Sequence, residues 1–318
     1  MEVTPMALFV AKRLLMALAT VLVVAVLAFL LVHAMPGSPG AVSLGAGASQ
    51  DAIDQLNQQL GWNDPLFTQF FRWLGNAVQG NLGVSLIDGR SISVDLTDRL
   101  PVTASLAAGA TLLSAVLGIA LGVTAAVRGG LLDQVIGGFV GLLVALPAFW
   151  VGIIFVYLFA VQSSVFPATG YVPFEVSPQD WAMSLALPII TLAVGGAAFI
   201  ARQTRASMLE ALQQEHIRTL RATATPTWKI LYVHALRYAS LPIVAGIALQ
   251  FIGLFGGSVI AEQLFAMPGL GQAVQSSVST HDAPAVQGVV VIATVVVVAV
   301  NLVLELATKF LDPKLRAS

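Results

Sequence analysis

The chain has 318 residues, of which 57% are hydrophobic and 10% are charged, and its net charge is −1. Because ordinary globular chains contain about 25% charged residues, this composition indicates an integral membrane protein and argues against nucleic acid as a partner. The chain has no cysteine, which excludes disulfides and thiolate ligands. The histidines are too widely spaced to predict a metal site; they are His33, His216, His234 and His281.

The first apolar run covers residues 14–34 and directly follows Lys12 and Arg13. It could be a membrane span or a signal peptide. It is longer than the roughly 7–15-residue core of a signal peptide and close to the ~20 residues that cross a bilayer. We therefore expect a first span whose N-terminus lies in the cytoplasm.

A long polar segment follows at residues 36–100, and its Gly- and Pro-rich beginning, residues 36–48, predicts a flexible exit from the membrane. Ser49 predicts the N-cap of one helix, and Asp64-Pro65 predicts the start of another. The apolar face of this second helix could lie against the outer leaflet, pack on other spans or meet a partner protein. It consists of Phe67, Phe70, Phe71 and Leu74.

Five further apolar runs predict membrane spans at residues 101–127, 135–161, 184–201, 241–260 and 285–306. In the third span, Pro147 predicts a kink because proline lacks an N–H group and its ring clashes with the preceding turn. Glycines spaced four residues apart predict close helix packing. These pairs are Gly118 with Gly122, Gly137 with Gly141, and Gly253 with Gly257.

The segment between the fourth and fifth spans, residues 202–242, is strongly basic. It holds six of the 15 Lys and Arg residues: Arg202, Arg205, Arg218, Arg221, Lys229 and Arg237. Because Lys and Arg resist translocation, this segment is expected in the cytoplasm, and six spans with both termini inside is the consistent topology. This segment either transmits a conformational change from a soluble partner to the spans or serves only as a topology anchor.

Local patterns predict two helices in this basic segment. Residues 202–220 are rich in helix formers, and Thr225-Pro226 resembles an N-cap followed by proline at the first helical position. Pro242 is expected to interrupt the second helix. The predicted buried face of that helix consists of Trp228, Leu231, Tyr232 and Ala235.

The chain contains no energy-transducing motif. None of its lysines follows a glycine, so the phosphate-binding G-x-x-x-x-G-K-[ST] loop is absent, and no H-E-x-x-H motif occurs. An ion-driven carrier should instead carry ionisable groups deep in its spans. Glu262 lies at the outer end of the fifth span, and Glu305 stands four residues before Lys309, where an ion pair is expected. An ion-driven carrier is therefore the rival prediction, and a membrane scaffold without transport is a third.

Five stretches carry a family resemblance. The stretches ASMLEALQQEHIRTLRA and HALRYASLPIV resemble the cytoplasmic coupling loop of ABC-importer permeases, in the dipeptide and oligopeptide branch. The outer MPGLG loop and the LDPKLR terminus resemble the same branch, and QLGWNDPLFTQFFRWLGNAVQGNLGVSL resembles the B-type member of its two-permease pair. The family pattern T-A-R-A-K-G falls on residues 219–224, where Ala224 stands in place of the glycine.

The resemblance implies an all-α integral membrane protein with six transmembrane helices, the type I ABC-importer permease fold and a long extracytoplasmic loop between helices 1 and 2. Residues 1–100 would hold the first helix and this loop. Residues 101–308 would form the transmembrane domain, including the cytoplasmic coupling loop at 202–242, and residues 309–318 a cytoplasmic tail.

The resemblance also implies partners: a second permease, two cytoplasmic ATPase domains that bind ATP and Mg, and an extracytoplasmic substrate-binding protein. The chain itself would bind no cofactor and would lie in a bacterial inner membrane. The substrate would be a short peptide, although relatives in this branch divide among dipeptides, oligopeptides, haem, nickel chelates and glutathione.

Three sets of site residues are expected. The residues that meet the ATPase are Glu215, His216, Arg218, Thr219, Arg221, Ala222, Thr223, Ala224 and Thr225. The candidates for the translocation pathway are Pro147, Gln250 and Asn301, although the two amides could equally serve in helix packing. The candidates for binding-protein contact are Met267, Pro268, Gly269, Leu270 and Gly271.

Overall fold

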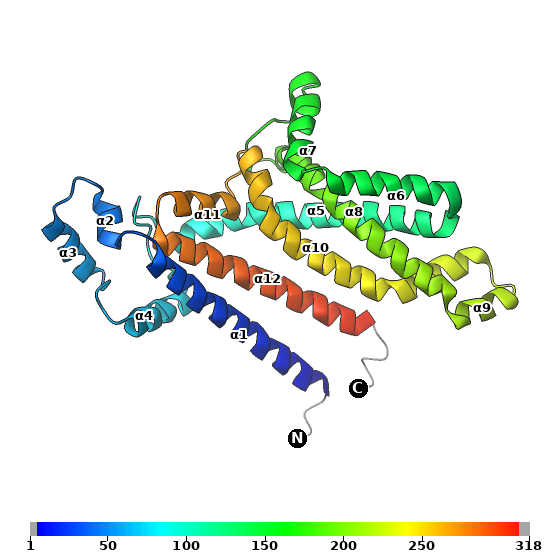
Figure 1. Ribbon diagram of the computed structural model, residues 1–318, viewed down its shortest axis with the longest axis horizontal. Coiled ribbons are helices and arrows are strands. Elements are labelled where there is room, and N and C mark those ends of the chain that lie inside the picture. Colours follow the sequence, from blue (N-terminus) through cyan, green and yellow to red (C-terminus); the bar gives the residue numbers. More distant parts are fainter. Residues whose placement is uncertain (1–4, 312–318) are drawn as a thin grey trace. The chain divides into compact units, whose positions relative to one another are not determined.

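The computed structural model describes residues 5–311, which form helices joined by short connections (Figure 1). The described residues divide into two compact units, one of residues 5–103 with 268–302 and one of residues 104–267 with 303–311. The helices are α1 (Pro5–Ala34), α2 (Pro39–Leu44), α3 (Gln50–Gln59), α4 (Leu66–Val78), α5 (Ile92–Arg128), α6 (Gly130–Ala145), α7 (Ala148–Phe155), α8 (Pro178–Gln213), α9 (Glu215–Ala222), α10 (Leu236–Leu264), α11 (Leu270–Ser279) and α12 (Ala283–Leu311), with π-helices η1 (Val156–Gln162) and η2 (Lys229–Ala235).

Five stretches of helix are long and apolar enough to cross a membrane: Val10–Ala34, Ile92–Arg128, Pro178–Gln213, Lys229–Leu264 and Ala283–Glu305. The pair Gly130–Ala145 and Ala148–Gln162 passes the same criterion as one bent span, which brings the number to six. The predicted all-helical fold with six spans is therefore confirmed, with the third span broken.

The break in the third span lies at Pro147. The two halves meet at 95°, a much sharper change than the kink that the sequence predicts. Leu146 is extended (ψ 126°), as expected for a residue before proline. The Pro147 carbonyl then accepts hydrogen bonds from Trp150 N and Val151 N at 3.0 and 3.3 Å, so α7 starts as a new helix.

Prolines elsewhere do not end helices. The second span begins at Ile92 rather than at residue 101, and Pro101 lies inside it. Pro242 likewise lies inside α10, so the predicted interruption is wrong. A proline within a helix removes one N–H donor but leaves the other backbone hydrogen bonds in place. These remaining hydrogen bonds let α5 and α10 continue past their prolines.

The segment between the first two spans is largely helical rather than flexible. Ser38 accepts a hydrogen bond from Ala41 N and caps α2, so the expectation of a flexible exit at residues 36–48 is wrong. The buried Asn57 of α3 accepts from Gly40 N at 2.8 Å and donates to Ser38 Oγ at 2.9 Å. The predicted start of α3 after Ser49 is confirmed, as is that of α4 after Asp64-Pro65.

One of the three glycine pairs brings helices together. A Cβ on Gly118 would lie 2.7 Å from Ile200 Cβ, and a Cβ on Gly122 would lie 2.6 Å from the Ala201 carbonyl oxygen. These glycines therefore let α5 approach α8 closely. The other two pairs make no such approach among the described residues, because no atom of another element lies within 4 Å of a Cβ at Gly137, Gly141, Gly253 or Gly257.

Candidate functional site

The coupling segment, which we define as residues 215–225, begins where α8 ends. The sequence predicts one helix over residues 202–220, but Gln214 adopts extended geometry (φ −63°, ψ 146°) and breaks it. Residues after Gln214 form the separate helix α9, which lies at the end of α8 in Figure 1. The coupling segment is therefore an eight-residue helix followed by a turn.

Two side chains anchor α9 to the spans, the buried Ile217 and the partly buried Leu220. Ile217 is fully buried, with 0% exposure, whereas most of its neighbours in α9 are exposed. It belongs to an apolar cluster that joins the ends of α5 and α8 to η2 and α10. The other buried members are Val123, Ala126, Met208, Ala211, Ile230, Ala235, Ala239 and Ile243. The sequence prediction missed this anchor, although Ile217 and Leu220 form an i, i+3 apolar pair in a polar stretch.

Most of the predicted coupling residues are exposed, unlike this anchor. Eight of the nine are exposed: Glu215, His216, Arg218, Thr219, Arg221, Ala222, Thr223 and Ala224. Thr225 is half-buried. The segment thus offers a continuous polar surface with two cations, held by an apolar contact on its inner side.

The predicted buried face of the next helix is half right, because Ala235 is buried and Leu231 half-buried but two other members are exposed. Trp228 and Tyr232 are each 57% exposed, and the buried residues are Ile230, Ala235 and Ala239. The reason is that residues 229–235 form a π-helix, in which i→i+5 bonding lengthens the repeat. Residues five apart then share a face, so Ile230 and Ala235 turn inward.

The turn after α9 is a Schellman motif with alanine at its left-handed position. Thr225 N donates to the Leu220 carbonyl at 3.1 Å, and Ala224 N donates to the Arg221 carbonyl at 3.2 Å. Ala224 has φ +55°, a conformation that glycine adopts without steric cost. Ala224, which stands in place of the family glycine, therefore occupies the backbone position that favours glycine.

Ala224→Gly is expected to stabilise this turn modestly. The left-handed conformation costs alanine about 1–2 kcal/mol, and glycine removes this cost. Glycine also raises the conformational entropy of the unfolded chain, which offsets about 0.4–1 kcal/mol of the gain. Ala222→Gly, at the last residue of α9, should instead destabilise the helix, by less than the ~1 kcal/mol that applies to a helix interior. Hydrogen exchange of a peptide spanning residues 219–228 should slow in the first variant and quicken in the second. Equal acceleration in both variants would contradict the assigned strain.

An ion pair fixes the C-terminal part of α8 to the start of α6. Arg205 Nε and Nη2 each lie 2.5 Å from one carboxylate oxygen of Asp133. Such bidentate geometry restrains orientation as well as distance. The pair joins residues 72 positions apart, and local sequence patterns gave no signal for it.

The pathway candidates occupy different surroundings. Pro147 lies at the break of the third span. Gln250 packs against α8, where a Cβ on Gly196 would lie 3.0 Å from its Nε2 atom, in agreement with a packing role. Asn301 is half-buried in α12 and belongs to the other compact unit.

The MPGLG loop is mostly packed within the chain. Met267 is 0% and Leu270 3% exposed, Gly269 and Gly271 are also buried, and Pro268 is the exposed member. Leu270 N donates to Thr103 Oγ1 at 2.8 Å. In this conformation a partner can therefore reach the loop mainly through Pro268.

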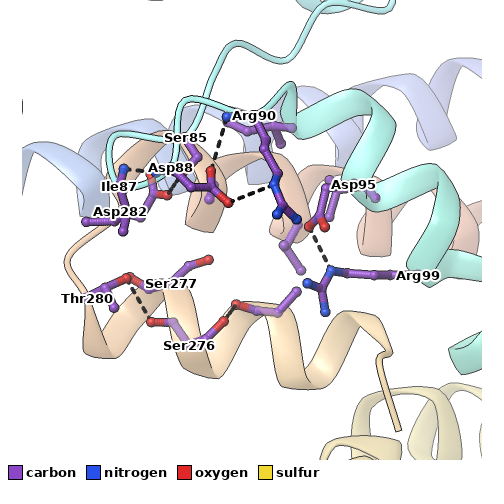
Figure 2. A pocket seen from close by; sticks show the side chains of 15 residues that line it. Ser85, Ile87, Asp88, Arg90, Asp95, Arg99, Ser276, Ser277, Thr280 and Asp282 are labelled. Atoms are coloured by element: carbon purple, nitrogen blue, oxygen red, sulfur yellow. Dashed lines mark hydrogen bonds and ion pairs between the residues drawn. The ribbon is translucent and has the colours of Figure 1, made fainter. Parts of the chain in front are cut away.

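A cavity of 230 Å³ lies between the residue 85–90 hairpin, the start of α5, and helices α11 and α12 (Figure 2). Asp282 ties the hairpin down, because it accepts hydrogen bonds from Ser85 Oγ at 2.5 Å and Leu86 N at 3.2 Å. Figure 2 also shows the ion pairs of Arg90 with Asp88 and Arg99 with Asp95. The Arg90 backbone N–H, and then Ser85, hold the pKa of Asp88 below its usual value. The sequence did not predict this cavity.

One carboxyl group of the fifth span is more enclosed than the sequence suggests. Glu262 is 0% exposed and accepts a hydrogen bond from Ser258 Oγ at 3.0 Å. The expected pair of Glu305 with Lys309 involves a side chain outside the described residues. The predicted tail at residues 309–318 also falls largely outside them. In the part of the chain that the structure describes, His, Asp and Glu side chains form no metal-binding group.

The fold resembles that of a solved importer. The inward-facing MetNI methionine ABC transporter matches with a TM-score of 0.57 and 20% identity, over 68% of this chain and 96% of the matched chain. At this identity the match shows the fold alone.

Curated relatives match over nearly the whole chain. A probable peptide ABC transporter permease of Sinorhizobium fredii is 35% identical, over 98% of this chain and 100% of the relative. The oligopeptide transport permease AppB of Bacillus subtilis is 34% identical (98% and 99% covered), and the glutathione transport permease GsiC of Escherichia coli is 34% identical (97% and 98% covered).

Two family descriptions cover the chain in sequence. Residues 6–107 match the N-terminal part of the membrane component of binding-protein-dependent transport systems. Residues 118–317 match the inner membrane component of the same systems. The chain therefore belongs to the family of inner membrane components of binding-protein-dependent transport systems, the permease subunits of type I ABC importers.

Proposed function

We propose that this chain is one of two permease subunits of an ATP-driven importer, and that it passes short peptides from an extracytoplasmic binding protein to the cytoplasm. The observation that carries the proposal is the coupling segment, whose polar face is exposed while Ile217 is buried among the spans. The names of the relatives support peptides as the substrate class.

The coupling segment is built to receive a force from a soluble partner. Arg218 and Arg221 are exposed and can pair with acidic groups on an ATPase subunit. ATP and Mg are bound by that partner, since this chain lacks a phosphate-binding loop. A displacement of α9 reaches α8 through the chain at Gln214, and reaches α5 and α10 through the Ile217 cluster. Movement of these spans opens the pathway alternately to either side of the membrane.

The proposed topology places both termini and residues 202–242 in the cytoplasm, because most Lys and Arg residues then lie inside. Residues 35–91 and the MPGLG loop then lie outside, where the binding protein delivers its substrate. Pro268, the exposed member of that loop, is the residue available for this contact. Gln250 and Asn301 lie in different compact units, and their amide side chains are the polar candidates for the pathway.

A carrier driven by an ion gradient is the rival function, and the buried carboxyl group of Glu262 is the observation that favours it. Uptake of a labelled dipeptide into proteoliposomes separates the two. We expect uptake only with the partner permease, ATPases and binding protein present, together with ATP. Uptake should persist with a protonophore and in Glu262→Gln. Uptake by this chain alone, driven by a proton gradient and lost in Glu262→Gln, would refute the importer.

A further inference from the structure

Helix α4 has an apolar surface wider than its contact with the protein. At 3.6 residues per turn, its apolar side chains cover an arc of roughly 160°. Phe70 occupies one side of this arc and makes an edge-to-face contact with Phe29 of α1, with ring centroids 5.4 Å apart. Phe67, Phe71 and Val78 occupy the other side and are 75%, 50% and 82% exposed.

The contact with α1 places α4 at the depth of the membrane. Phe29 belongs to the apolar span Val10–Ala34. It lies five residues before the end of that span, which corresponds to about 7–8 Å along the helix axis. Figure 1 shows α4 beside this part of α1, in the same compact unit. An aromatic contact at that depth requires the apolar side of α4 to reach below the level where α1 leaves the bilayer.

Polar contacts orient the opposite side of α4 toward the end of α1. His33, one turn beyond Phe29, lies 3.1 Å from Gln69 through Nε2 and Oε1, and it stacks on Trp62 with ring centroids 4.3 Å apart. Arg72 pairs with Asp64 at 2.5 Å on the polar side of the helix. The helix is thus polar toward the end of the span and apolar toward its middle.

We propose that α4 is an interfacial helix, with the exposed rings of Phe67 and Phe71 inserted among the lipid acyl chains at the C-terminal end of α1. Amphipathic helices of this kind bury their apolar side about 5–10 Å into the boundary between headgroups and acyl chains, which agrees with the depth of Phe29. Trp62 precedes the helix and Trp73 lies within it, and tryptophan is enriched in the aromatic belt of a membrane interface. In the proposed topology this is the outer leaflet, but the insertion itself does not depend on the topology or on the transport function.

The depth of single nitroxide labels tests this inference in the full chain. Because the chain has no cysteine, labels can be attached at Phe67→Cys and Phe71→Cys, with Thr68→Cys and Asn76→Cys as matched controls on the exposed polar side. In phosphatidylcholine nanodiscs, labels at 67 and 71 should collide several-fold more often with oxygen than with a water-soluble nickel chelate. Labels at 68 and 76 should show the reverse preference.

Two results would overturn the inference. Labels at 67 and 71 that are as accessible to the nickel chelate as those at 68 and 76 would show that the rings face water. Labels at 67 and 71 that are shielded from both reagents would show that a protein surface covers them. Either result would leave the proposed import function untouched, because peptide uptake is measured separately.

Discussion

Ile217→Ala is expected to uncouple ATP hydrolysis from transport while leaving the six spans inserted. Ile217 is 0% exposed and is the buried side chain of α9. Shortening a buried isoleucine to alanine typically costs 2–5 kcal/mol, because the transfer free energy is lost and a cavity remains. Leu220, which is only partly buried, would be the remaining apolar contact of α9 with the α5–α8–α10 cluster, so α9 should be loosened. Peptide uptake should then fall at least tenfold, as measured in proteoliposomes.

Ile217→Val is the matched control, because it removes one methylene group and should cost only about 0.5–1.5 kcal/mol. Uptake by this variant should stay within a few-fold of the unmodified protein. Equal uptake by Ile217→Ala and the unmodified protein, at equal amounts in the membrane, would show that α9 does not transmit force through this side chain.

Ala222→Glu is expected to block the contact of the ATPase partner with the exposed surface of α9. Ala222 is the last residue of α9 and is exposed, so a larger side chain fits the isolated chain without strain. At a packed interface, the same change adds bulk and a desolvated negative charge that lacks a partner. We expect the ATPase to be lost on affinity purification, and uptake to be lost with it.

Ala222→Ser is the control for this surface, because serine adds one hydroxyl group and no charge. It should retain both ATPase binding and uptake. If Ala222→Glu also retains both at normal membrane levels, residues around the end of α9 do not form the interface and act only as a topology anchor.

Features encoded in neighbouring residues were predictable from the sequence. Apolar runs reveal the spans because a bilayer requires about 20 apolar residues whatever the tertiary arrangement. The start of α3 follows from the side chain of Ser49, which accepts a hydrogen bond from Ala52 N three residues later. The position of the predicted coupling residues followed from resemblance, and eight of the nine are exposed.

Features that depend on tertiary contacts were not predictable. In the helix after the coupling turn, Trp228 and Tyr232 were wrongly assigned to the buried face because they fit an α-helical period, while the segment is π-helical. The spacing of Gly137 and Gly141 matches that of Gly118 and Gly122, but it does not reveal whether a neighbouring helix lies opposite.

Long-range polar contacts left no local signal either. Asp133 and Arg205 are 72 residues apart, and Ser85 and Asp282 are 197 apart. From the sequence alone, each of these polar residues would be expected to be exposed to water rather than paired. Only the folded chain brings the members of each pair together.

Photo-crosslinking from the exposed surface of α9 tests the central claim most directly. A benzophenone maleimide attached at Thr219→Cys, in a chain that otherwise lacks cysteine, reports which polypeptide lies against that surface. In membranes that import peptide, the account predicts a crosslinked product containing the ATPase subunit, and no such product from Asp88→Cys in the other compact unit. Active transport without an ATPase crosslink from residue 219, or with one from residue 88, would contradict it.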